Sequence, residues 1–228
     1  TGNNTVGGLA GRNDARGTVR NVTISGNTVG DSQVGGVVGF NVGSIQGSTV
    51  SVSVDGADGV GGVVGNNLPE ATVRDVTASN SVSGSKNVGG VVGFNDGTIT
   101  ASSAGGELSG SDQVGGLVGF NLGTIQRAQA SVDVTANGTG GDDVGGLIGD
   151  NDGNLRNATA SGNVSGTEDV GGLAGDNDGT VRNATASGSV TGTDFATGGL
   201  VGDNDGGTIR NATASGSVTG TDVVGGLV

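Results

Sequence analysis

The chain has no cysteine, histidine, tryptophan, tyrosine or methionine, and it contains one proline and four phenylalanines in 228 residues. Without histidine and cysteine it can form neither a Ser-His-Asp nor a Cys-His catalytic arrangement. The same absence excludes metal sites built from imidazole or thiolate ligands, and it excludes disulfide bonds. Carboxylates that could perform acid–base chemistry recur from repeat to repeat, whereas a reaction centre is normally unique. We therefore expect no enzyme activity in this chain.

Large side chains are too scarce for an ordinary globular core. Hydrophobic residues make up 32% of the chain, and there are 53 glycines. A core of normal density needs large side chains in its middle, whereas small side chains suit a thin core of stacked layers. Disorder is the competing interpretation of such a composition. The hydrophobic residues recur at fixed positions, which favours an ordered chain.

The charge is strongly acidic, at −13 from 22 acidic and 9 basic residues. No basic stripe is evident that would meet nucleic-acid phosphates. Asp outnumbers Glu by 19 to 3, and Lys86 is the single lysine. Such a surface suits a halophilic source or divalent cations. No segment of residues 1–228 is apolar enough to span a membrane, and none has the pattern of a signal peptide, so we expect any targeting signal or anchor to lie outside this sequence.

The motif Val-Gly-Gly-Leu/Val-x-Gly recurs every 26 to 30 residues. The copies begin at Val6, Val34, Val60, Val88, Val114, Val144, Val170, Thr197 and Val224. A period of about 27 residues is typical of solenoids. We treat residues 1–228 as one repeat domain. Because the sequence starts at Thr1 and stops within the ninth copy, we expect it to be a piece of a longer protein.

Asn follows each motif start by seven positions in all eight full repeats. These residues are Asn13, Asn41, Asn67, Asn95, Asn121, Asn151, Asn177 and Asn204. A glycine turn and an aliphatic residue follow. Each repeat then closes with a run in which apolar and polar residues alternate, such as 157–164. In this run we expect Ala158, Ala160, Gly162 and Val164 to share the buried face. We therefore predict an all-β, parallel β-solenoid of eight coils, flattened or narrowly triangular in section, with an internal ladder of Asn amides.

The Gly-Gly-Leu-Val-Gly core at 115–119 and the Asn-x-Gly-x-Ile that follows it resemble the GLUG repeat. The resemblance covers essentially the whole chain. It implies a non-catalytic segment of a large bacterial or archaeal surface protein, such as an adhesin, and it carries over no catalytic residue. Repeats 1 and 3 depart from the pattern at 14–17 and 68–71, where we expect the coil to bulge at one corner.

Gly-Asp-Asn-Asp-Gly sequences in the last three repeats are the best candidates for a metal site. They contain Asp150, Asp152, Asp176, Asp178, Asp203 and Asp205. Two Asp in a glycine turn are a fragment of many Ca²⁺ loops, which use oxygen ligands. Stacked coils would bring like charges about 5 Å apart, which is unfavourable without a counter-ion. Either Ca²⁺ bridges the carboxylates, or the turns are simply solvated and salt screens their repulsion.

Phe40, Phe94 and Phe120 precede the ladder Asn in three repeats. If the Asn points inward, its predecessor should point outward, and so should Val38, Val92 and Val118. An exposed apolar strip of this kind would contact another chain or domain. The alternative is that the strand bends and these side chains fill a corner of the core.

Asn-x-Ser/Thr acceptors at Asn21, Asn157, Asn183 and Asn211 are the glycosylation candidates that we single out. Taken together, these features lead us to expect a structural spacer or stalk in an extracellular surface protein, adhesin or fibre. The alternative is a module that binds a partner protein, a glycan or a neighbouring fibre directly. A viral tail-fibre shaft has the same features. In either case we expect other chains or surface glycans as partners, and lateral self-association.

Overall fold

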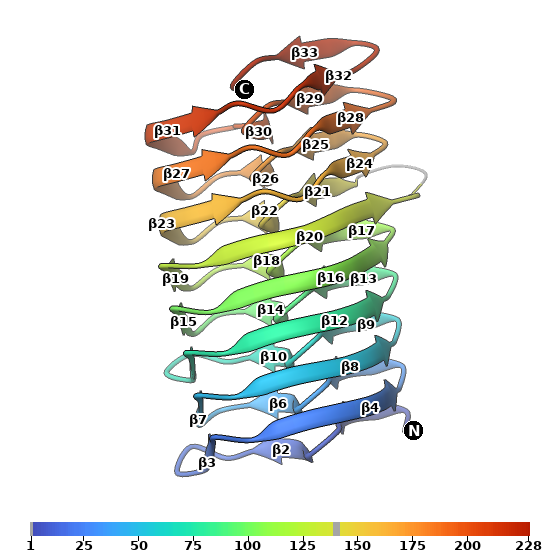
Figure 1. Ribbon diagram of the computed structural model, residues 1–228, viewed down its shortest axis with the longest axis vertical. Coiled ribbons are helices and arrows are strands. Elements are labelled where there is room, and N and C mark those ends of the chain that lie inside the picture. The colour runs from blue at the N-terminus through green and yellow to red at the C-terminus, as the bar shows by residue number, and fades with distance from the viewer. Residues whose placement is uncertain (1, 139–141) are drawn as a thin grey trace.

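The structure is a computed structural model that describes residues 2–138 and 142–228. These residues form 33 strands and no helix, so none of them belongs to a membrane-spanning helix. Successive coils stack along one axis, with the two ends of the chain at opposite ends of the stack (Figure 1). The strands pair in parallel with the equivalent strands of the coils below and above. The parallel β-solenoid is thereby confirmed.

Sheet A contains the start of each glycine motif and has nine strands. They are β1 (Asn4–Gly7), β5 (Ser32–Gly35), β9 (Asp58–Gly61), β13 (Lys86–Gly89), β17 (Asp112–Gly115), β21 (Asp143–Gly145), β25 (Asp169–Gly171), β29 (Ala196–Gly198) and β33 (Val223–Gly225). Sheet B contains the end of the motif and has eight strands. They are β2 (Ala10–Asn13), β6 (Val38–Asn41), β10 (Val64–Asn67), β14 (Val92–Asn95), β18 (Val118–Asn121), β22 (Ile148–Asn151), β26 (Ala174–Asn177) and β30 (Val201–Asp203).

Sheet C forms the long opposite wall, and its strands differ between the two ends of the solenoid. In the first five coils each pass consists of a short strand and a long one. The short strands are β3 (Thr18–Arg20), β7 (Ser44–Gln46), β11 (Thr72–Arg74), β15 (Thr98–Thr100) and β19 (Thr124–Gln126). The long strands are β4 (Thr23–Val29), β8 (Thr49–Asp55), β12 (Thr77–Ser83), β16 (Ser103–Gly110) and β20 (Gln129–Ala136).

In the last three coils, the first strand of sheet C reaches further and the second is short. The first strands are β23 (Asn154–Ala160), β27 (Thr180–Ala186) and β31 (Thr208–Ala214), and the second are β24 (Val164–Gly166), β28 (Val190–Gly192) and β32 (Val218–Thr219). The break falls at Gly162 and its equivalents, where a Cβ would lie 1.8 Å from the Val132 carbonyl oxygen of the coil below. The chain therefore bends inward there, which only glycine permits.

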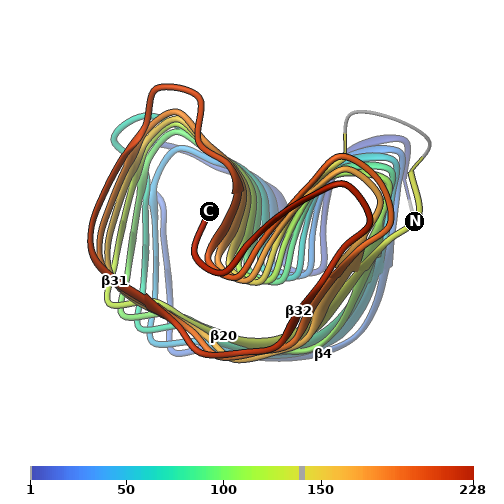
Figure 2. The ribbon, with the colours of Figure 1, turned by 90° about the horizontal axis from the view of Figure 1, so that it is seen from above.

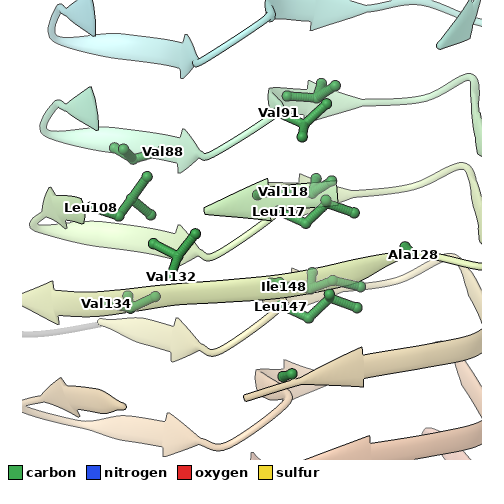
Figure 3. Packing of buried hydrophobic residues seen from close by; sticks show 14 of the residues in the cluster. Val88, Val91, Leu108, Leu117, Val118, Ala128, Val132, Val134, Leu147 and Ile148 are labelled. Carbon is green, nitrogen blue, oxygen red and sulfur yellow. The ribbon is translucent and has the colours of Figure 1, made fainter. Parts of the chain in front are cut away.

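The core consists of small aliphatic side chains stacked on their own kind. Val91, Leu117 and Leu147 form one such column across three coils (Figure 3). The aliphatic position after the turn is fully buried in coils 2 to 7, as at Ile45 and Leu155. Ala158, Ala160 and Val164 are buried while Thr159 between them is exposed, as the alternation predicts. Each layer buries its apolar surface against its neighbours, which stabilises the stack.

The cross-section is indented between sheets A and B and is neither flat nor triangular (Figure 2). The second glycine of each Gly-Gly pair lies at this bend. A Cβ on Gly116 would lie 2.2 Å from the Gly146 carbonyl oxygen of the next coil and 3.1 Å from Cβ of Ala130 in sheet C. The motif glycines therefore let the chain between sheets A and B fold inward until it meets sheet C. The flattened or triangular cross-section that we predicted from the sequence did not include this indentation.

The long turns of repeats 1 and 3 bulge at the corner between sheets B and C, as expected. Gly17 donates its amide hydrogen to the Asp14 carbonyl oxygen at 2.7 Å, and Ala71 donates to the Leu68 carbonyl oxygen at 3.1 Å. These tight turns absorb the extra residues without disturbing the strands on either side.

We predict that Gly116→Ala destabilises the solenoid by about 1–3 kcal/mol or more, because the new methyl group collides with backbone that belongs to the next coil. Gly105→Ala is the matched control, since the nearest atom to a Cβ there is the Ser131 Oγ, at 3.5 Å. Urea unfolding of both variants measures the difference. Equal midpoints for the two variants would contradict this account of the bend.

Candidate functional site

The eight ladder Asn form one continuous hydrogen-bonded column inside the corner between sheets B and C. Each Nδ2 donates to the Oδ1 of the next Asn along the stack, at 2.7 to 2.8 Å in all seven steps. Asn41 and Asn95 each also donate to a turn carbonyl oxygen, at 3.3 Å. Six members of the ladder are fully buried. The ladder is thus confirmed, and every amide hydrogen bond that it makes supports the stack.

The three Phe of the aromatic column (Phe40, Phe94 and Phe120) are half-buried on sheet B. Phe94 pairs in register with Phe120, and their ring centroids lie 5.5 Å apart in an edge-to-face arrangement. The Arg12 guanidinium lies over the Phe40 ring, 5.2 Å from its centroid. Most of the aromatic surface is therefore already in contact within the chain, which leaves a smaller apolar area for a partner than the sequence suggested.

Val38, Val92 and Val118 are fully buried, so the prediction that they extend an exposed apolar strip is wrong. The cause is the close packing of sheets A and B. A Cβ on Gly39 of sheet B would lie 2.6 Å from the Gln33 carbonyl oxygen of sheet A. Glycine at this motif position lets the two backbones touch. The neighbouring valines are therefore covered, although the alternation along the strand places them on the side opposite the buried Asn.

Beyond Phe120 the same column becomes acidic. Phe120 pairs in register with Asp150, then Asp176, then Asp203, and we call these three carboxylates the acidic column. Asp143 and Asp169 pair with each other on sheet A and are half-buried. The Gln113 Nε2 donates to the Asp150 Oδ2 at 3.0 Å. The Asp150 Oδ1 is buried and accepts no hydrogen bond from any described residue.

The pKa values show how poorly this surface tolerates negative charge. Burial, together with repulsion from the carboxylates of Asp150 and Asp176, raises the pKa of Asp143 to about 8. Burial, with repulsion from Asp152 and Asp176, raises the pKa of Asp150 to about 7 although the Gln113 hydrogen bond opposes the shift. Burial likewise raises the pKa of Asp169 to about 6. Part of this surface is therefore protonated near neutral pH.

The six predicted calcium ligands are divided between two surfaces. Asp150, Asp176 and Asp203 lie half-buried on sheet B, whereas Asp152, Asp178 and Asp205 lie on exposed turns. Ca²⁺ binds six to eight oxygen atoms converging on one point. The part of the chain that the structure describes contains no group of three acidic side chains arranged to hold a metal ion. Ca²⁺ binding at these residues stays a prediction.

The glycosylation candidates occupy one exposed corner of sheet C. Asn157, Asn183 and Asn211 have left-handed backbone, with φ of 52° to 55°, which Asn tolerates better than most residues. The Asn183 Nδ2 donates to the Asn157 Oδ1 at 3.1 Å, and the Asn211 Nδ2 donates to the Asn183 Oδ1 at 3.2 Å. This second, outer ladder competes with a glycan for the amide nitrogens. Asn21 lies at the equivalent corner of the first coil, with φ of 53°.

Sequence reasoning missed a column of arginines on the outer surface of sheet C. Arg156, Arg182 and Arg210 pair in register, one coil apart. The signal was present as the sequence Arg-Asn-Ala-Thr-Ala, which occurs three times at 156–160, 182–186 and 210–214. It escaped notice because the overall charge is acidic, and net charge does not reveal how charges are distributed around a solenoid.

A shallow hollow with a volume of about 440 Å³ lies on the outer face of sheet C, around Asp133, Thr135, Asn163 and Ser189. The Asp133 Oδ1 accepts the backbone amide hydrogen of Asn163 at 2.8 Å, and the Asn163 Oδ1 accepts that of Ser189 at 3.1 Å. These side chains satisfy backbone donors at the break in sheet C, so their role is structural.

Comparison with known families gives one match. The family model described as "Glug: The GLUG motif" matches residues 2–30, 166–191 and 193–219, which correspond to the first, seventh and eighth coils. Searches of curated proteins and of solved structures find no match. The resemblance drawn from the glycine motif is therefore confirmed at the level of the repeat.

We predict that Asn95→Ala lowers the free energy of unfolding by at least about 2 kcal/mol, because it leaves buried polar groups of Asn67 and Asn121 unpaired. Asn154→Ala, at an exposed position on β23, is the control. Urea unfolding followed by circular dichroism compares the two variants. An equal and small effect of both substitutions would mean that the ladder contributes little to stability.

The raised pKa values predict that stability falls as the pH rises. Asp143 and Asp150 bind protons more tightly in the folded chain than in the unfolded chain, where their pKa is about 3.9. The stabilising protonation is complete below about pH 4 and is lost towards pH 8. Unfolding free energies measured across this range should decline, and the double variant Asp143→Asn/Asp150→Asn should flatten the decline. An exposed control, Asp31→Asn, should leave it unchanged; identical slopes in all three proteins would refute the assignment.

Proposed function

We propose that this chain, a GLUG-repeat β-solenoid, is a non-enzymatic spacer in an extracellular surface protein, adhesin or fibre. The proposal is supported chiefly by the continuous stack, in which each coil contacts its neighbours through three sheets and an Asn ladder (Figure 1). A stack of this kind fixes the distance between its ends, since each added coil lengthens it by about 4.8 Å.

The repeats are suited to a length-adjustable role. Coil 6 pairs in register with coil 7, and coil 7 with coil 8, at both strands of sheet C, and the same Ala, Thr and Arg residues recur at equivalent positions. A coil that presents the same upper and lower surfaces can be duplicated or removed without new contacts. The acidic surface also suits high salt, in which stacked carboxylates repel one another less.

Direct binding through the aromatic column is the alternative function. The half-burial of Phe40, Phe94 and Phe120 and the full burial of the adjoining valines reduce the apolar area that such a surface offers. Specific protein interfaces usually bury about 800 Å² on each partner. The spacer proposal therefore agrees better with the packing of sheet B.

Deletion of residues 170–196, one whole coil, should leave a folded chain that is shorter by about 4.8 Å, measured by small-angle X-ray scattering. In the parent protein on its cell surface, a spacer predicts that adhesion depends on coil number and survives the triple variant Phe40→Ser/Phe94→Ser/Phe120→Ser. The reverse pattern, in which adhesion tolerates the deletion and is lost in the triple variant, would overturn the spacer proposal and support direct binding.

A further inference from the structure

The basic residues of this acidic chain are concentrated along one line of its surface. Arg20, Arg74, Arg156, Arg182 and Arg210 occupy a single register column of sheet C, which we call the basic column. Arg127 lies one residue beyond this column in the fifth coil. Six of the nine basic residues of the chain therefore lie on one edge of the solenoid.

The basic column is uncompensated where it is densest. Arg156, Arg182 and Arg210 stack at the spacing of the coils, about 4.8 Å. Among the described residues, the one ion pair made by the column joins Arg74 to Asp75, with the Nε 3.6 Å from the Oδ2. The Nε of Arg182 is buried and has no hydrogen-bond acceptor in the part of the chain that the structure describes. Stacked like charges repel, so an external anion would stabilise this arrangement.

A second column of opposite charge runs parallel to it along the neighbouring turns. Asp152, Asp178 and Asp205 are exposed there, in the same three coils that carry Arg156, Arg182 and Arg210. The structure shows no ion pair between these turn carboxylates and the arginines of the same chain. One edge of the solenoid thus presents two adjacent lines of opposite charge with the same spacing along the axis.

We propose that two copies of this chain associate side by side through this edge, with the turn carboxylates of each copy facing the basic column of the other. A two-fold axis parallel to the solenoid brings the two lines into this arrangement and pairs each coil with the same coil of the partner. A two-fold axis perpendicular to the solenoid would instead place each line opposite its own kind. The charge pattern therefore selects a parallel pair, whose interface is isologous and closed.

The shared period makes a second copy a better partner than an unrelated polyanion. Both lines repeat once per coil, so a contact formed at coil 6 is repeated at coil 7 without any adjustment of register; in coil 8 the turn that carries Asp205 contains one extra residue, Gly206, with φ of 115°. Each copy carries a net charge of −13, which opposes association over long distances. Salt near 0.15 M screens charges separated by more than about 8 Å and leaves direct ion pairs less affected. Pairing is therefore strongest at moderate salt and is lost at high salt.

Charge reversal tests the pairing in the intact chain. Sedimentation velocity should show wild-type dimers at about 0.15 M NaCl and monomers at about 1 M. The variants Arg156→Glu/Arg182→Glu/Arg210→Glu and Asp152→Lys/Asp178→Lys/Asp205→Lys should each be monomeric alone, and an equimolar mixture should form heterodimers. The control Asp31→Lys/Asp194→Lys/Asp222→Lys changes the net charge as much as the second variant, at exposed sites elsewhere, and should still dimerise.

Circular dichroism verifies the folding of each variant, and a triple Arg→Gln variant replaces the Glu variant if the latter misfolds. A wild type that is monomeric at moderate salt would overturn the proposal, as would a mixture that stays monomeric. Wild-type monomers that bind a sulfated polysaccharide through the arginines would also overturn it and assign the column to an anionic polymer. These outcomes are independent of the spacer proposal, which is tested by the length of the coil-deletion variant.

Discussion

Parallel coil-on-coil register is the constraint on which the rest of this structure depends. Each strand pairs with the equivalent strand of the next coil, so a residue at a given repeat position lies about 4.8 Å from the residue at the same position above and below it. A residue type that recurs in every repeat therefore always has the same residue type as its neighbour in the next coil. Whether that neighbour stabilises or destabilises the stack depends on the chemistry of the side chain and on its exposure.

The same constraint has opposite consequences inside and outside the solenoid. Asn carries both a donor and an acceptor, so a buried column of Asn satisfies itself at every step. Carboxylates only accept hydrogen bonds when ionised, so in the acidic column burial, together with repulsion between neighbouring carboxylates, raises the pKa of Asp150 and Asp176. Arginines only donate, and among the described residues the basic column has one ion pair, Arg74 with Asp75, while the buried Nε of Arg182 has no acceptor. The outer columns consequently depend on protons, salt or a neighbouring molecule.

Much of the fold was predictable because the period is visible in the sequence. The ladder Asn and the aliphatic position after each turn recur in every coil, and stacking is the arrangement that buries both. The indentation was not predictable, because it depends on the distance between two sheets. Gly36 and Gly39 are required because the backbone of another segment lies too close to either of them for a Cβ to fit, and this closeness is visible only in the structure. For the same reason the parity of Val38 and Phe40 suggested exposure, whereas Val38 is covered.

The candidate surfaces were less predictable than the core, because they depend on columns and not on motifs. Asp150 and Asp152 are separated by a single residue in the sequence, yet one lies on sheet B and the other on an exposed turn. Arg156 and Arg182 are 26 residues apart in the sequence but adjacent in space. Reading the sequence down each repeat position, as the coils stack, would have revealed both. In a solenoid the functional unit is therefore the column of equivalent residues. A surface with alternating columns of charge presents the same recognition pattern on every coil that keeps the register.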